Sequence, residues 1–192
     1  MKTAQGSVMA ERASAKAPDD TAPFEVWQTA LYDQLRSADV SIFSHVPDAG
    51  FRVLIDRAVA DPDAVSVPLT SEQEGVGIAA GAHLGGKRAV LMMQSSGVGN
   101  CTNHFALIQH GQFPFIGIVS MRGEFGEANP WQYPMGQAIE PVLSAMGVQC
   151  LWCRSVSDVS QATTAAITMA FKSNRAVAIL LSQRLLGAKA FG

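Results

Sequence analysis

Six short apolar runs, separated by longer segments of helical character, constrain the fold more than any other feature of the sequence. The runs lie at residues 40–46, 64–69, 88–94, 115–121, 149–153 and 176–181. Several are apolar throughout, which is typical of strands covered on both faces of a parallel sheet. Helices are expected at residues 24–37, 51–60, 71–84, 98–110, 137–146 and 157–172. This alternation predicts a single α/β domain with a mainly parallel six-stranded sheet, flanked by helices on both faces.

The chain is poor in charge for its length. Its 192 residues include 14 Lys+Arg and 16 Asp+Glu, with a formal net charge of −2. Charged residues make up 16% of the chain, against about 25% in an average soluble domain. A surface with so few charges suggests that a large face is buried against partners. Without a basic excess, nucleic acid is not an expected partner.

The ends of the chain and its cysteines indicate where the protein works. No run approaches the ~20 apolar residues of a membrane span, so no contact with a membrane is expected. Residues 1–22 mix charged and small residues without the apolar core of a signal peptide, and we interpret them as a flexible N-terminal tail. Three cysteines without an export signal favour a reducing compartment, the cytoplasm. Cys150 and Cys153 lie in an apolar run and are interpreted as buried structural thiols.

Ligands of open α/β sheets bind beyond the carboxyl ends of the strands, so the segments that follow the strands matter most. The first such segment is HVPD at 45–48, in which Pro47 stiffens a loop that carries His45 and Asp48. The alternative is an ordinary turn with Asp48 as an N-cap. The second segment, SEQEGVGIAAG at 71–81, has two carboxylates with separate roles.

Ser71 and Glu74 form an S-x-x-E pattern, which predicts a capping box. Glu72 has no such role and is expected at the first helical position, where the helix dipole favours an ionised carboxylate. The three glycines that follow cost up to about 1 kcal/mol each in a helix. We expect either a close ligand or backbone, or tight packing on a neighbouring helix, to offset that cost.

The third and fourth segments offer groups for binding an anion. MQSSGVGN at 93–100 ends a strand and begins a helix with free amides. It is not a dinucleotide fingerprint, because Thr102 occupies the third glycine position. Asn100 and His104 are candidate ligand contacts, with an ordinary polar helix cap as the alternative. The loop at 122–136 is expected to form a lid or a subunit contact, with Arg122 as a candidate anion clamp or a solvated side chain. No histidine has a partner at metal-ligand spacing, so no metal ligand is expected in this chain.

Together the four segments resemble the pyrimidine-binding domain of thiamine-diphosphate-dependent 2-oxo acid decarboxylases, most closely the sulfopyruvate decarboxylase α subunit and phosphonopyruvate decarboxylase family. The resemblance spans residues 24–185 and rests on VPD at 46–48, E-x-E-G-V-G-I-A-A-G at 72–81, MQ-x-SG-x-GN at 93–100 and RGE at 122–124. It implies a thiamine-diphosphate pyrimidine-binding domain over residues 23–192.

The resemblance also implies roles for individual residues. Glu72 matches the catalytic glutamate that hydrogen-bonds N1′ of the cofactor's aminopyrimidine and favours the imino form, whose 4′ nitrogen takes the proton from the thiazolium C2. Cofactor contacts are implied for Glu72, Pro47, Gly97, Val98 and Asn100. The substrate-binding candidates are His45, Asp48, Ser95, Ser96, His104 and Arg122.

Departures from the family pattern shape the expected assembly and substrate. Ala49 and Ser95 stand where relatives commonly have Ser and Asn, so those contacts do not carry over. The Gly-Asp-Gly that holds the diphosphate and Mg²⁺ in such enzymes is absent from the sequence. The resemblance therefore implies a β subunit that carries the diphosphate-binding domain, in an α/β hetero-oligomer with active sites between subunits.

The expected reaction converts 3-sulfopyruvate to sulfoacetaldehyde and CO₂. The alternatives are decarboxylation of phosphonopyruvate or another short 2-oxo acid, a non-catalytic assembly module of the same fold, and a stand-alone nucleotide-binding protein.

Overall fold

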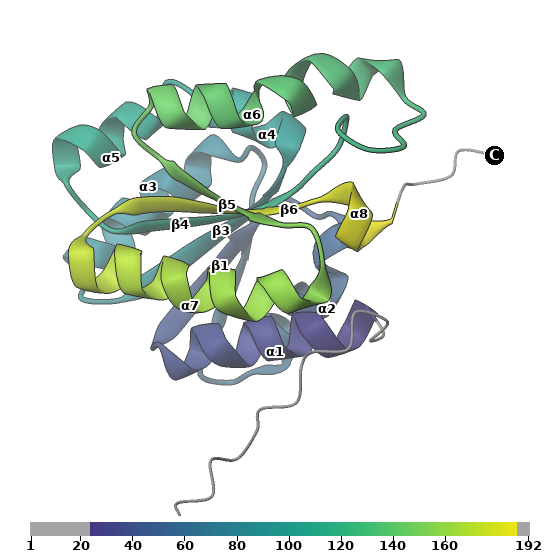
Figure 1. Ribbon diagram of the computed structural model, residues 1–192. Coiled ribbons are helices and arrows are strands. Elements are labelled where there is room, and N and C mark those ends of the chain that lie inside the picture. Colours follow the sequence, from purple (N-terminus) through teal and green to yellow (C-terminus); the bar gives the residue numbers. More distant parts are fainter. Residues whose placement is uncertain (1–23, 188–192) are drawn as a thin grey trace, which may run out of the picture.

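A six-stranded sheet in the order β2-β1-β3-β4-β6-β5 crosses the centre of the protein in the computed structural model, which describes residues 24–187 (Figure 1). The strands are β1 Val40–His45, β2 Val65–Pro68, β3 Arg88–Gln94, β4 Phe115–Ser120, β5 Gln149–Cys153 and β6 Ala176–Leu181. Every pairing is parallel. Every residue of β4 and β6 is buried, as expected for strands covered on both faces. The predicted α/β fold class is confirmed.

Helices cover both faces of the sheet (Figure 1). One face carries α1 Phe24–Ser37, α2 Arg52–Ala60 and α7 Val156–Ser173, and the other carries α3 Gln73–Leu84, α4 Ser95–Cys101, α5 Phe105–Gly111 and α6 Tyr133–Ala145. Each layer buries its own apolar cluster against the sheet, around Leu31, Leu54 and Phe43 on the first face and Val76, Val98 and Phe105 on the second. The tail interpreted at residues 1–22 lies outside the described residues.

The single helix predicted over residues 98–110 is wrong, because two helices occupy this segment. α4 begins at Ser95 and ends at Cys101, and α5 begins at Phe105. At the break, the Thr102 hydroxyl donates to the carbonyl oxygens of Val98 and Gly99, at 3.2 and 3.1 Å. A side chain that occupies these carbonyls competes with the helical hydrogen bonds, which explains why the helix stops there.

The segment at 122–136, predicted as a loop, contains helical structure. It contains a short 3-10 helix, η2 Pro130–Gln132, capped by the Asn129 side chain, and α6 starts at Tyr133 instead of residue 137. Prolines near the start of each helix explain the early start, since they lack only amides that would be unpaired there. Two further short helices, η1 Ala49–Phe51 and α8 Gln183–Leu186, follow β1 and β6.

The cysteines are free thiols, and the chain shows no membrane span where it is described. Cys101 and Cys153 are buried, and Cys150 is half-buried. Burial raises the pKa of Cys101 and of Cys153 to about 12 and that of Cys150 to about 11. The thiols therefore stay protonated at neutral pH, which supports their interpretation as structural groups. Among residues 24–187, no helix is both long and apolar enough to cross a bilayer.

Candidate active site

All four chemistry-bearing segments lie at the same edge of the sheet. Because the strands are parallel, β1 to β4 end side by side, with His45 opposite Pro68 and Gln94 opposite Ser120. The chain passes from β1 to β2 on one side and returns to β3 on the other, so the order of the strands reverses between β1 and β3. Such a reversal opens a crevice where ligands of α/β sheets bind.

Glu72 stands at the start of α3, in helical conformation one residue before Gln73. Its side chain is buried, with 8% of the residue exposed. Oε2 accepts a hydrogen bond from Nδ2 of Asn100 on α4, at 2.8 Å. Among the described residues, Oε1 has no hydrogen-bond donor. Oε1 is therefore available to a ligand, and the hydrogen bond of Oε2 to Asn100 fixes its position.

The Glu72 carboxylate packs directly on the backbone of Gly97. A Cβ at this position would lie 2.4 Å from Glu72 Oε1, far inside van der Waals contact. Glycine is thus required for the close approach of α4 to the carboxylate. Three residues predicted to bind one ligand, Glu72, Gly97 and Asn100, are brought together in this way. Val98 is fully buried in the core, and Pro47 is exposed near the end of β1.

The predicted capping box of Ser71 and Glu74 is wrong, because Glu74 pairs with Thr70 and not with Ser71. The Glu74 carboxylate accepts from the amide and the hydroxyl of Thr70, at 3.2 and 2.9 Å. Helical backbone geometry already begins at Glu72, so the carboxylate reaches back to the residue before Ser71. Glu74 nevertheless has the structural role that was expected of it. Of the three α3 glycines, Gly75 packs on Leu91 of β3, whereas nothing lies within 4 Å of a Cβ at Gly77 or Gly81.

Asp48 and Ser96 are connected through Gln94. Asp48 caps η1 by accepting from the Gly50 amide at 2.6 Å, which confirms the N-cap alternative. Its other carboxylate oxygen accepts from Nε2 of Gln94 at 2.8 Å. Oε1 of Gln94 in turn accepts from the Ser96 hydroxyl at 3.0 Å. This chain of hydrogen bonds joins the end of β1 to the residue next to Gly97.

Ser95 and Arg122 hold the ends of β3 and β4 together. The Ser95 hydroxyl is fully buried and accepts from the Arg122 amide at 3.0 Å. The Arg122 guanidinium forms a bidentate pair with Glu127, at 2.5 and 2.7 Å, and only 6% of either residue is exposed. The hydrogen bond from Arg122 lowers the pKa of Glu127 to about 2. The solvated alternative for Arg122 is therefore wrong, and the fork expected to clamp an external anion is paired with Glu127.

A cavity of about 200 Å³ lies beside this pair. Its lining includes Asp48, Gly50, Ser120 and Arg122. The Ser120 hydroxyl is buried and has no hydrogen-bond partner among the described residues. An unpaired buried polar group is costly, and such groups are often completed by a ligand or water.

The two candidate histidines lie apart from these clusters. His45 ends β1 and is 4% exposed, and burial lowers the pKa of its imidazole, which favours the neutral ring. His104 is exposed in the break before α5, and its ring makes no hydrogen bond with a described residue. Across residues 24–187, no group of three His, Cys, Asp or Glu side chains could hold a metal ion.

Gln94, Ser120 and Glu127 were not among the predicted site residues. Gln94 and Ser120 are each the polar last residue of a strand, after an apolar run of five residues, and that position could have identified both. Glu127 had no such signal, because its role depends on a loop that folds back on Arg122.

The curated proteins that are similar to this chain are decarboxylases or decarboxylase subunits. The chain is 35% identical over 153 residues to the sulfopyruvate decarboxylase subunit alpha of Methanothermobacter thermautotrophicus, covering 79% of this chain and 93% of that one. It is 32% identical over 152 residues to the same subunit of Methanocaldococcus jannaschii, covering 79% and 90%. A phosphonopyruvate decarboxylase of Streptomyces viridochromogenes is 34% identical over 105 residues, which cover 54% of this chain and 26% of that protein. No protein-family model matches the chain.

A solved structure supports the fold. A 2-oxoglutarate:ferredoxin oxidoreductase from Magnetococcus marinus superposes with a TM-score of 0.67 at 17% identity, over 84% of this chain. The match spans 29% of the oxidoreductase chain. At this identity the likeness establishes a shared architecture and no shared activity.

Proposed function

The chain belongs to the family of sulfopyruvate decarboxylase α subunits, and from this premise we propose that it forms half of a thiamine-diphosphate-dependent decarboxylase. The proposed reaction converts 3-sulfopyruvate to sulfoacetaldehyde and CO₂. The proposal rests on one observation: the buried Glu72 carboxylate is held by Asn100 over the bare backbone of Gly97.

The residues present fit the aminopyrimidine of thiamine diphosphate. Glu72 Oε1 lacks a described donor and can accept a hydrogen bond from a protonated ring nitrogen. Gly97 allows the carboxylate to pack directly on the α4 backbone, a position that any side chain at residue 97 would displace. When bound, the cofactor supplies the electron sink for decarboxylation. Glu72 orients it and holds the proton at the ring nitrogen, and Asn100 keeps the carboxylate in place. Such acid–base groups contribute about 10²–10⁴-fold to rate.

The proposed enzyme needs a second chain. The sequence carries no Gly-Asp-Gly, and no cluster of metal-binding side chains is found in the part of the chain that is described. We assign the diphosphate and Mg²⁺ to a β subunit, with the cofactor between the two chains. The subunit names of the relatives agree with this division. The cytoplasm remains the proposed location, because the three cysteines are free thiols, as is usual in a reducing compartment.

The acidic end of the substrate requires a cation, and Arg122 is the proposed contact. Arg122 lines the 200 Å³ cavity, and its guanidinium is paired with Glu127. A sulfonate bound beside Arg122 would share the guanidinium with Glu127, whose two oxygens accept from Nε and Nη2. Ser120 and Asp48, which line the same cavity, are further proposed contacts. His45, Ser96 and His104 are not among the lining residues and stay candidates only.

Phosphonopyruvate is the second candidate substrate, supported by the phosphonopyruvate decarboxylases among the relatives. The two substrates share an anionic tail and differ in its charge. We would co-express the chain with a candidate β subunit and measure CO₂ release with thiamine diphosphate and Mg²⁺. We expect faster turnover of 3-sulfopyruvate than of phosphonopyruvate. Preference for phosphonopyruvate would reassign the substrate, and a stable complex inactive on every short 2-oxo acid would favour the assembly module.

A further inference from the structure

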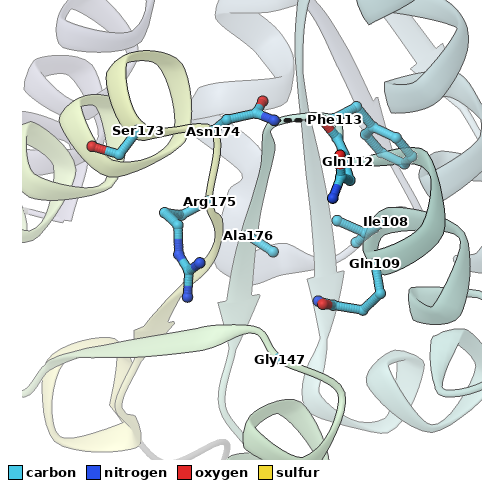
Figure 2. Close-up of a pocket in the computed structure, with 9 residues that line it drawn as sticks. All are labelled: Ile108, Gln109, Gln112, Phe113, Gly147, Ser173, Asn174, Arg175 and Ala176. Carbon is cyan, nitrogen blue, oxygen red and sulfur yellow. Dashed lines mark hydrogen bonds between the residues drawn. The ribbon is translucent and has the colours of Figure 1, made fainter.

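A second cavity lies at the opposite edge of the sheet from Glu72. It has a volume of about 340 Å³ and sits where β4 and β6 begin (Figure 2). Its lining consists of Ile108, Gln109, Gln112, Phe113, Gly147, Ser173, Asn174, Arg175 and Ala176. The six residues of β6 separate it from the carboxyl edge, which at ~3.3 Å per residue is about 20 Å.

The wall of this cavity is built from three helix ends tied together by carboxamides. Gln109 Nε2 donates to the carbonyl of Met146, just after α6, at 3.0 Å. The same carboxamide lies against Gly147, where a Cβ would come within 2.4 Å of Nε2. Asn174, the left-handed C-cap of α7, donates from Nδ2 to the carbonyl of Gln112, the left-handed C-cap of α5 (Figure 2). These contacts fix the polar rim before any ligand arrives, which lowers the cost of binding.

Arg175 supplies the charge of the cavity. Its guanidinium extends into the space between Ala176 and Gly147 (Figure 2). Among the described residues, no side chain or carbonyl accepts a hydrogen bond from this guanidinium. The lining contains no acidic residue. The helix ends nearby are carboxyl ends, whose dipoles favour a cation such as Arg175. Their carbonyls already accept backbone hydrogen bonds, for example that of Met169 from the Arg175 amide.

We propose that this cavity is a binding site for a small metabolite bearing a carboxylate or phosphate, with Arg175 as its charge partner. The planar guanidinium fork matches the oxygen pairs of such groups. The Gln112 side chain has no described partner and provides further hydrogen bonds to the ligand. A volume of 340 Å³ lies at the lower end of the ~300–1,000 Å³ typical of small-molecule sites, which sets the size of the ligand. None of the residues that line this cavity belongs to the Glu72 site.

The test is equilibrium binding to the full chain by calorimetry at low ionic strength, with inorganic phosphate and citrate as probes. We expect saturable one-to-one binding of at least one probe with a Kd of about 1 mM or tighter. Arg175→Gln should weaken it at least tenfold. Arg175 is exposed and makes no side-chain contact that folding depends on, so the variant should keep its Tm.

Lys172→Gln is the matched control, because it removes the same charge from the end of α7 outside the cavity lining. It should bind the probes as the parent chain does. Equal weakening in both variants would mean attraction to the general surface charge and would overturn the proposal. So would the absence of saturable binding of both probes up to about 10 mM.

Discussion

At the scale of the residue, the decisive feature is the Glu72 carboxylate, in which a hydrogen bond fixes one of the two oxygens. Asn100 donates to Oε2 of Glu72, and Gly97 allows the carboxylate to pack directly on the backbone of α4. The sequence alone predicted the importance of Glu72 from its place at a helix start. The sequence could not predict that Asn100 fixes the Glu72 carboxylate, because the two residues are 28 positions apart and belong to different helices.

Gly97→Ala tests this arrangement. The new Cβ would lie 2.4 Å from Oε1, so the Glu72 side chain must move away from its present position. We expect the assembled enzyme to lose about tenfold to 10²-fold in turnover, as for other small displacements of a reacting group. The loss is measured as CO₂ release, and the Tm of the chain is measured beside it.

Gly77→Ala is the control for the general effect of replacing a helical glycine by alanine. Nothing lies within 4 Å of a Cβ at Gly77, and alanine favours the helix by up to about 1 kcal/mol. Its Tm should therefore rise. Full activity of Gly97→Ala would show that the carboxylate does not need its observed position.

At the scale of the element, the loop that follows β4 is organised around a buried carboxylate. Glu127 accepts from the Arg122 guanidinium, from the Asn129 amide at 3.0 Å and from Gln183 Nε2 at 3.0 Å. Glu124 also accepts from the Ser182 hydroxyl and from the Gln183 amide. The loop is thus tied to the start of α8 and is not a freely moving lid.

This network predicts a dependence of stability on pH. The pKa of Glu127 falls from its ordinary value of 4.5 to about 2, because Arg122 hydrogen-bonds the charged form. The unfolded chain therefore binds more protons than the folded chain between these values. The stabilisation is complete above pH 4.5 and is lost as the pH falls towards 2.

Denaturant unfolding at pH 5 and pH 3 measures this effect. Glu127→Gln should be less stable by about 3–5 kcal/mol at neutral pH, because it leaves Arg122 buried without its charge partner. The variant should also lose this part of the pH dependence. An equal loss of stability between pH 5 and pH 3 in the parent and in the variant would contradict the assignment.

The predictions of elements succeeded where burial decides the structure. The strands β3, β5 and β6 and the helix α1 have the predicted bounds, because their apolar patterns are packed as the periodicity requires. The predictions failed at the α4–α5 break and at the start of α6. At the break the Thr102 hydroxyl binds nearby carbonyl groups, and at the start of α6 a proline favours the first turn. Such local effects leave little trace in hydrophobic periodicity.

At the scale of the whole molecule, an exposed apolar patch lies next to α4. It consists of Pro130, Trp131, Pro134 and Met135, which line a hollow of about 590 Å³, and Trp131 is 85% exposed. Met135 lies against Gly99, one residue from Asn100. A partner that covers this patch would therefore also border the Glu72 site.

Trp131→Ala tests whether the proposed β subunit covers the patch. An exposed tryptophan at the centre of an interface contributes about 2 kcal/mol or more. We expect affinity for the β subunit to fall at least about 30-fold, while the isolated chain keeps its Tm. Val59 is 70% exposed on α2, on the opposite face of the sheet, and Val59→Ala should leave the affinity unchanged. Equal affinity of both variants would place the interface elsewhere.

The central claim is that Glu72 performs chemistry in a site shared with a second chain. The most direct measurement is CO₂ release from 3-sulfopyruvate by the mixed complex carrying Glu72→Gln, beside the Glu74→Gln complex and the chain alone. Glu74 is the matched control, because it lies on the same helix and caps Thr70. We predict a 10²–10⁴-fold loss for Glu72→Gln, near-parent activity for Glu74→Gln and none for the chain alone. Full activity of the Glu72→Gln complex, or turnover by the chain without a partner, would contradict the account.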